Sequence, residues 1–157
     1  MFLVVNIFKE KKEKDFRLVI QPSERNDIGL VKTKNYGIIS YLAKKDSKKI
    51  GEFILWALKE SDEIKRIDNK VNLGEFFNLS SYKKIPSKYN FLDFLFNGTE
   101  YELNLYTKDG YGYSTFKDNI GNECKYIFKE KPSAEELGSK VMEMFEFKEN
   151  YDKERSI

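Results

Sequence analysis

The sequence has 157 residues, which is the length of one compact domain. It contains no histidine and a single cysteine, Cys124. Catalysis by Ser-His-Asp or Cys-His arrangements, a histidine-ligated metal, a cysteine zinc cluster and an intramolecular disulfide are therefore excluded. Lysine and arginine number 28 against 26 acidic residues, a net charge of +2, whereas a dedicated nucleic-acid-binding domain is usually strongly basic.

A single unpaired thiol fits a reducing, cytoplasmic location, and we expect Cys124 to act as a small buried side chain in a strand. Residues 1–8 are apolar, but basic residues follow them instead of preceding them, and no small-residue cleavage site is present. This segment predicts a β-strand and not a signal peptide. No apolar run reaches the ~20 residues that a membrane-spanning helix needs.

The N-terminal part contains short apolar segments separated by polar ones. This pattern predicts strands over residues 1–8, 16–20, 30–31 and 36–43. Residues 10–14 are charged and predict a turn or loop. Residues 21–29 also predict a loop, because Pro22, Asn26 and Gly29 are residues that interrupt regular structure.

The first clear helical pattern follows Asp46, whose short side chain is suited to capping a helix N-terminus. Apolar residues then recur at spacings of three and four, which places them on one helical face and predicts a helix over residues 47–64. They are Ile50, Phe53, Ile54, Ala57 and Leu58. Leu55 and Trp56 lie off this face, so we expect the helix to make a second contact.

The C-terminal half predicts four antiparallel strands in a meander, over residues 91–96, 101–106, 111–116 and 124–128. Asn97-Gly98 and Asp109-Gly110 separate the first three, and both pairs tolerate the positive φ of a tight hairpin. Residues 118–122 form the third turn. The glycines near residue 110 join two strands, so they indicate a hairpin and not a phosphate-binding loop at a helix N-terminus.

A second helix is predicted over residues 133–147, because Ser133 and Glu136 form a capping box. The mostly charged residues after Phe147 predict a frayed tail. Together the elements predict a single α/β domain of the α+β type over residues 1–157. Its mainly antiparallel sheet carries a C-terminal meander, and two principal helices pack on it.

The two predicted helices begin in a similar way, since residues 41–54 align with residues 128–141. Each copy is a strand followed by a cap, Asp46 or Ser133, and then by an apolar residue and a glycine in the first helical turn. Gly51 and Gly138 each cost about 1 kcal/mol of helix propensity relative to alanine. We interpret the repeat as a structural motif in which glycine lets the helix backbone approach the sheet or a neighbouring strand.

This arrangement resembles the CdiI-like immunity proteins of bacterial contact-dependent growth inhibition systems. The resemblance rests on the cap-x-x-x-apolar-Gly sequences at residues 46–51 and 133–138, on Ala-Leu-Lys-Glu-Ser at residues 57–61, and on Ser-Tyr-Lys-Lys at residues 81–84. It covers roughly residues 29–147. It implies a cytoplasmic, bacterial immunity protein that is not an enzyme and needs no cofactor. Its partner would be the C-terminal toxin domain of the inhibitor, with a nuclease as one candidate activity.

For such a partner we predict a surface built from aromatic anchors and an acidic patch. Tyr111 and Tyr113 lie in the second predicted hairpin, and tyrosine is enriched at binding hot spots. Glu60, Asp62 and Glu63 cluster at the end of the first predicted helix, where they are suited to a basic toxin. No catalytic, cofactor-binding or metal-binding residues are predicted.

Two other functions remain open from the sequence. Aromatic residues flanked by lysines, at residues 82–84 and 88–89, fit a single-stranded nucleic-acid-binding module that stacks bases and contacts phosphates. Such binding would weaken steeply between about 50 and 200 mM salt. A hydrolase using paired carboxylates is the least favoured function, because the 26 acidic residues single out no pair.

Overall fold

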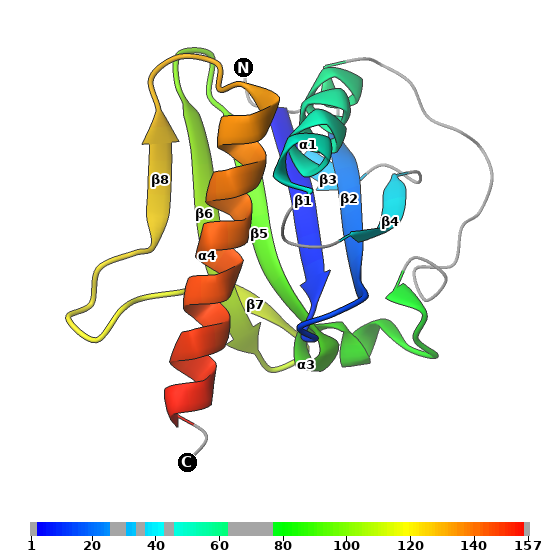
Figure 1. Cartoon of the computed structure of the whole chain (residues 1–157), viewed down its shortest axis with the longest axis vertical. Coiled ribbons are helices and arrows are strands. Elements are labelled where there is room, and N and C mark those ends of the chain that lie inside the picture. Colours follow the sequence, from blue (N-terminus) through cyan, green and yellow to red (C-terminus); the bar gives the residue numbers. More distant parts are fainter. Residues whose placement is uncertain (1–2, 26–30, 34–36, 43–45, 63–76, 156–157) are drawn as a thin grey trace.

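The fold is an antiparallel β-sheet with two long helices on one of its faces (Figure 1). The computed structural model describes residues 3–25, 31–33, 37–42, 46–62 and 77–155. Within these ranges eight strands form one sheet, and their pairings are antiparallel. This arrangement confirms the predicted α+β class.

The sheet follows the order β3-β2-β1-β5-β6-β7, while β4 pairs with β2 and β8 pairs with β6. Its strands are β1 (Leu3–Glu10), β2 (Phe16–Arg25), β3 (Val31–Thr33), β4 (Ile38–Leu42), β5 (Tyr89–Phe96), β6 (Tyr101–Asp109), β7 (Gly112–Thr115) and β8 (Lys125–Phe128). The helices are α1 (Ser47–Ser61), the 3-10 helix η1 (Tyr82–Lys84), α3 (Ile85–Lys88) and α4 (Ala134–Arg155).

Strict alternation along β1 divides its side chains between the two faces of the sheet. One set is buried under α1 and α4 in the main core, and the other set is half-buried on the opposite face. The main core combines apolar side chains of both helices with those of β1, β2, β5 and β6: Val5, Ile7, Leu18, Ile20, Ile50, Ile54, Leu92, Phe94, Leu103, Leu105, Leu137, Val141 and Phe145. A smaller cluster of Val19, Phe77 and Tyr89 lies on the opposite face.

The second strand is longer than the sequence predicted, because β2 continues through residues 21–25. The prediction of a loop from Gln21 onward was wrong for this part. Residues 16–20 pair with β4 and residues 23–25 pair with β3, so Pro22 falls between the two registers. A proline has no N–H to donate there, and neither β3 nor β4 loses a bond to it.

The predicted hairpins are confirmed, with Gly98 at φ 97° and Gly110 at φ 61° in their turns. The fourth strand departs from a simple meander, because β8 pairs with β6 and not with β7. β6 is long enough for both neighbours: residues 106–109 pair with β7 and residues 101–104 pair with β8. Both short strands therefore lie along the same edge of β6.

The two principal helices are confirmed, with differences at their ends. Asp46 occupies the N-cap position of α1, but its side chain makes no capping hydrogen bond. The capping box of α4 is present: the Glu136 N–H donates to Ser133 Oγ at 3.2 Å, and the Ser133 N–H donates to Glu136 Oε1 at 3.3 Å. α4 continues to Arg155, where the sequence predicted a frayed tail after Phe147.

The repeated glycines bring the first turns of α1 and α4 into direct backbone contact. A Cβ atom added to Gly51 would lie 1.7 Å from the Ala134 carbonyl oxygen, and one added to Gly138 would lie 1.7 Å from the Ser47 carbonyl oxygen. The close approach predicted for these glycines is therefore made to the other helix and not to the sheet. The two copies of the motif pack against each other.

Ser61 connects the end of α1 to the first two strands. Its Oγ accepts the Ser23 N–H at 3.1 Å and lies within donating distance of the Ala57 and Val4 carbonyl oxygens, at 2.8 and 3.0 Å. We expect Ser61→Ala to lower the free energy of unfolding by about 1–3 kcal/mol, because it leaves the buried Ser23 N–H without an acceptor. Urea denaturation measures the change. Ser139→Ala, at an exposed position in α4, is the control and should be neutral or slightly stabilising.

None of the helices in the described part of the chain is long and apolar enough to span a membrane.

Candidate interaction surface

The two tyrosines predicted as anchors have different surroundings. Tyr111, at the tip of the β6–β7 hairpin, is 71% exposed, and the Lys83 ammonium lies 5.3 Å from the centre of its ring. Tyr113 is half-buried, and its Oη donates to the Tyr89 carbonyl oxygen at 2.7 Å. Its ring contacts Phe91 at a centroid distance of 5.0 Å, and burial raises its pKa above the ordinary tyrosine value. Tyr111 is therefore available to a partner, whereas Tyr113 supports the sheet face beneath it.

The predicted acidic patch lies at the C-terminal end of α1. Glu60 is half-buried and Asp62 is exposed, and between them Ser61 contacts the backbone of Val4 at the start of β1. Glu63 lies outside the described residues.

The structure does not bring this acidic patch together with the tyrosine hairpin. Tyr113 bonds to Tyr89, which pairs with Glu10 at the far end of β1. From Val4 to Glu10, at about 3.3 Å per residue, the two regions are separated by roughly 20 Å along the strand. A partner would have to contact both ends of β1 to use both groups.

The lysine-flanked aromatic segments also differ in exposure. Tyr82 is 57% exposed on η1 beside Lys83 and Lys84. Tyr89, in contrast, is 1% exposed, and its Oη donates to the Phe77 carbonyl oxygen at 2.7 Å. Tyr89 is therefore unable to stack on a base, and one of the two segments proposed for nucleic-acid binding is part of a core cluster.

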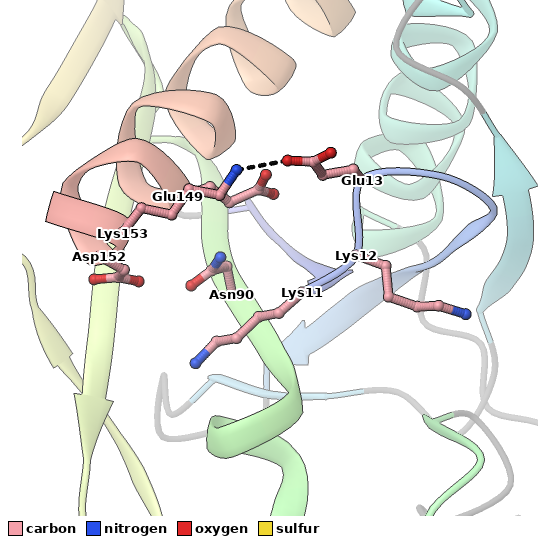
Figure 2. A pocket seen from close by; sticks show the side chains of 7 residues that line it. All are labelled: Lys11, Lys12, Glu13, Asn90, Glu149, Asp152 and Lys153. Atoms are coloured by element: carbon pink, nitrogen blue, oxygen red, sulfur yellow. Dashed lines mark hydrogen bonds and ion pairs between the residues drawn. The ribbon is translucent and has the colours of Figure 1, made fainter. Parts of the chain in front are cut away.

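A pocket of about 280 Å³ opens near the end of β1 that pairs with Tyr89. It lies between the β1–β2 turn, the start of β5 and the last turns of α4 (Figure 2). It combines three lysines, three carboxylates and one amide: Lys11, Lys12, Glu13, Asn90, Glu149, Asp152 and Lys153. Its charged lining is balanced in sign, so the pocket is polar without being strongly acidic or basic.

Each carboxylate of the pocket lies beside an ammonium group. Glu149 Oε1 is 2.5 Å from the Nζ of Lys9, a residue that is only 1% exposed. Asp152 is 2.6 Å from the Nζ of Lys148, which is 3% exposed. Glu13 is 2.5 Å from Lys153 across the pocket mouth, the contact drawn in Figure 2. The negative charges of the lining are thereby compensated within the protein.

Lys11 and Asn90 differ from these pairs. Lys11 donates from Nζ to the Pro86 carbonyl oxygen at 3.1 Å, and its pKa is lowered by burial and, secondly, by the positive charge of Lys148. Asn90 is 3% exposed, and its Nδ2 has no hydrogen-bond partner among the described residues. Figure 2 places the Asn90 amide between the Lys11 side chain and the side chains of α4. Two donor groups thus adjoin the same cavity.

A second polar group lies on the sheet face that the long helices leave uncovered. The Asp93 carboxylate accepts hydrogen bonds from Tyr106 Oη at 2.7 Å and from Asn104 Nδ2 at 2.9 Å. Burial raises the pKa of Asp93, and these two hydrogen bonds oppose the increase. Beside it, Phe91 stacks on Phe8 and on Tyr106, at centroid distances of 4.6 and 4.8 Å. The donors around Asp93 are already used internally, so we interpret this group as structural.

No cluster of three or more Cys, Asp or Glu side chains that could hold a metal ion occurs in the described ranges. Cys124 is half-buried next to β8, and its partial burial raises its pKa, which lowers the fraction of reactive thiolate. It packs against the main core, as expected for a small apolar side chain, but it is only half-buried and lies one residue before β8, so the predicted buried position within a strand was wrong.

Sequence reasoning missed the pocket because its residues come from three separate segments. One signal was available: Glu149 and Lys153 are four residues apart, as are Lys148 and Asp152. Opposite charges at this spacing stabilise a helix, and they indicate that α4 continues through the segment predicted as a frayed tail.

No protein-family model matches the chain, and no curated protein matches it in sequence. Solved structures do match it in fold. One is a protein of unknown function, NMB0488, from Neisseria meningitidis, with a TM-score of 0.60 and 12% identity over 90% of this chain and 93% of that chain. Another is a chain of the CdiA-CT/CdiI toxin and immunity complex from Yersinia pseudotuberculosis, with a TM-score of 0.60 and 10% identity over 88% of this chain and 92% of that chain.

Each similarity extends over nearly the whole length of this chain and of the chain it is compared with. The whole fold is therefore shared, and not only a part of it. At identities of 10–12% they establish the fold alone. The resemblance to CdiI-like immunity proteins is thus supported at the level of the fold.

Proposed function

We propose that this chain is an immunity protein that binds the C-terminal toxin domain of a contact-dependent growth inhibition effector and neutralises it stoichiometrically. The observation that carries the proposal is the similarity, over 88% of this chain, to a chain of a toxin and immunity complex. The sequence adds a second argument. Without histidine, the chain lacks the side chain most often used for acid–base catalysis, so a binding role is favoured over an enzymatic one.

The surface around the β6–β7 hairpin is suited to such a role. Tyr111 and Tyr82 are exposed, and Lys83 lies against the Tyr111 ring. Exposed tyrosines supply large contact area at low conformational cost and are common hot spots of protein interfaces. The acidic end of α1, with Glu60 and Asp62, would add a separate contact for a basic partner.

The proposal is tested by capturing the partner from cells. The tagged protein is expressed together with the polypeptide encoded immediately upstream of its gene, and the complex is purified at 50 and at 200 mM salt. We expect capture of the C-terminal region of a large secreted protein at both salt concentrations. We also expect expression of this chain to restore growth to cells that produce that region.

Recovery of RNA or DNA in place of a protein, with loss of binding between the two salt concentrations, would overturn the proposal and favour the nucleic-acid-binding module. Failure to restore growth in the presence of a stable complex would also contradict neutralisation. In that case the chain would be a binding partner without an immunity function.

Replacing Tyr111 with alanine is expected to weaken toxin binding by about 1 kcal/mol or more, roughly a fivefold increase in Kd. The melting temperature should not change, because the side chain is 71% exposed. Ile120→Ala, at an 81% exposed position on a different turn, is the matched control and should leave the Kd unchanged. Calorimetric titration and thermal denaturation separate the two effects. An unchanged Kd in Tyr111→Ala would remove this residue from the interface.

A further inference from the structure

The pocket next to the β1–β2 turn contains a buried donor group, the Asn90 side-chain amide, for which the described part of the chain provides no acceptor. Asn90 is buried on the side of β5 that faces α4, opposite Lys9 in the β1–β5 register. A buried amide N–H without an acceptor costs about 1–3 kcal/mol, so such groups are rare unless a ligand or a water molecule completes them. The Asn90 Nδ2 therefore indicates a position for an acceptor atom in the cavity.

Lys11 gives this position a positive charge. It is the lysine of the pocket lining whose hydrogen bond goes to a neutral group, the Pro86 carbonyl oxygen, whereas Lys12 and Lys153 lie within ion-pair distance of Glu10 and Glu13. Burial and, secondly, the ammonium group of Lys148 lower the pKa of Lys11, while the Asp152 carboxylate beside Lys148 opposes this effect. A carboxylate hydrogen-bonded to Lys11 would stabilise its charged form further.

The lining limits which anion fits. Glu13, Glu149 and Asp152 also border the cavity, each beside a lysine, so the single charge of Lys11 matches a monoanion better than a phosphate dianion or a polyanionic strand. A carboxylate carries a single charge and offers two coplanar oxygens, one for the ammonium group and one for the amide. The volume of about 280 Å³ is sufficient for one acidic side chain.

We propose that this pocket binds an aspartate or glutamate side chain of the protein partner, with Lys11 Nζ and Asn90 Nδ2 donating to its carboxylate. The inference rests on the proposed function in one respect, namely that the partner is a polypeptide. It places part of the interface at the β1–β2 turn and α4, beside the tyrosine-bearing hairpin.

The pocket is tested on the full-length protein without a toxin, by titrating the ¹⁵N-labelled chain with N-acetyl-glutamate amide. N-acetyl-glutamine amide and inorganic phosphate are the comparison probes. We expect saturable shifts of the Asn90 side-chain amide signals with the glutamate probe, and little or no shift with either of the others. Equal shifts with the glutamine probe, stronger binding of phosphate, or no shift with the glutamate probe would each overturn the inference.

Two lysine variants provide the matched comparison. Lys11→Gln removes the charge but retains most of the side chain, and we expect it to weaken binding of the glutamate probe about tenfold, the effect of one charge-assisted hydrogen bond. Lys14→Gln changes an exposed lysine of the same turn and should bind as the unmodified protein does. Equal affinities of the two variants would show that Lys11 does not contact the ligand.

The titration and the capture experiment fail independently. If the toxin is captured but the glutamate probe leaves the Asn90 signals unchanged, the pocket inference is wrong and the immunity function stands. If the probe binds and no toxin is captured, the pocket is a carboxylate site and the proposed function is wrong. When a toxin is in hand, Lys11→Gln should raise its Kd about tenfold while Lys14→Gln leaves it unchanged.

Discussion

Gly51→Ala is expected to destabilise the protein by more than about 3 kcal/mol, at the upper end of the overpacking range. The added Cβ would lie 1.7 Å from the Ala134 carbonyl oxygen, and this atom belongs to the backbone of α4. A flexible side chain could turn away, but a helix backbone has to move as a unit and to separate from α1. The gain in helix propensity, about 1 kcal/mol, is smaller than this cost. Urea denaturation monitored by circular dichroism measures the loss.

Two further variants show whether the helix contact is the cause. Gly138→Ala should be equally harmful, because its Cβ would meet the Ser47 carbonyl oxygen at 1.7 Å. Gly112→Ala is the control: its nearest neighbour would be 3.9 Å away, so we expect little change. A loss below 1 kcal/mol in Gly51→Ala would mean that the first turns of α1 and α4 are farther apart than described.

Gly51 and Gly138 also show which part of the contact between α1 and α4 can be predicted from the sequence. The repeat of a cap, an apolar residue and a glycine identified two similar helix starts, and the requirement for glycine correctly indicated a close approach. The partner in that approach was not predictable, because a glycine in the first turn of a helix allows any backbone to come close, and the sequence does not show which one lies opposite. Only the three-dimensional arrangement places Gly51 against Ala134 and Gly138 against Ser47.

Local signals predicted the elements better than their pairing. Asn97-Gly98 and Asp109-Gly110 determine hairpins through their own backbone preferences, and both hairpins are present. The attachment of β8 to β6 depends on the length of β6, since the residues beyond its pairing with β7 leave an unpaired edge for another strand. The loop predicted at Pro22 was wrong for a similar reason. Whether a proline interrupts a strand depends on whether a neighbouring strand pairs with it at that position.

The candidate site was partly predictable. Exposure of Tyr111 follows from its place at a hairpin tip, whereas Tyr113 lies within β7, where its ring contacts Phe91 of β5. The pocket was not predictable, since Lys11, Asn90 and Asp152 converge only through the pairing of β1 with β5 and the packing of α4. Burial of Lys9 was equally hidden, because a lysine in a strand is ordinarily exposed.

Glu149→Ala is expected to lower the free energy of unfolding by about 3–5 kcal/mol, the cost of leaving a buried charge without its counter-ion. Lys9 is 1% exposed, and its Nζ lies 2.5 Å from Glu149 and 4.2 Å from the centre of the Phe16 ring. Without the carboxylate, the ammonium group keeps its hydrogen bonds to the carbonyl oxygens of Glu10 and Lys12, at 3.1 and 2.9 Å, but these neutral acceptors do not compensate its charge. Denaturant unfolding at neutral pH measures the loss.

A matched exposed pair and a double replacement separate the charge from the packing. Glu13→Ala breaks the exposed contact with Lys153 and should leave the stability unchanged. Lys9→Met combined with Glu149→Leu removes both charges, and we expect it to recover most of the stability lost in Glu149→Ala. The double variant should nevertheless loosen the β1–β2 turn, because Lys9 donates to the Lys12 carbonyl oxygen there. Since Lys11 belongs to the same turn, we also expect the double variant to bind the glutamate probe more weakly. If the double variant is as unstable as Glu149→Ala, the packing of these side chains, and not the uncompensated charge, causes the loss in free energy of unfolding.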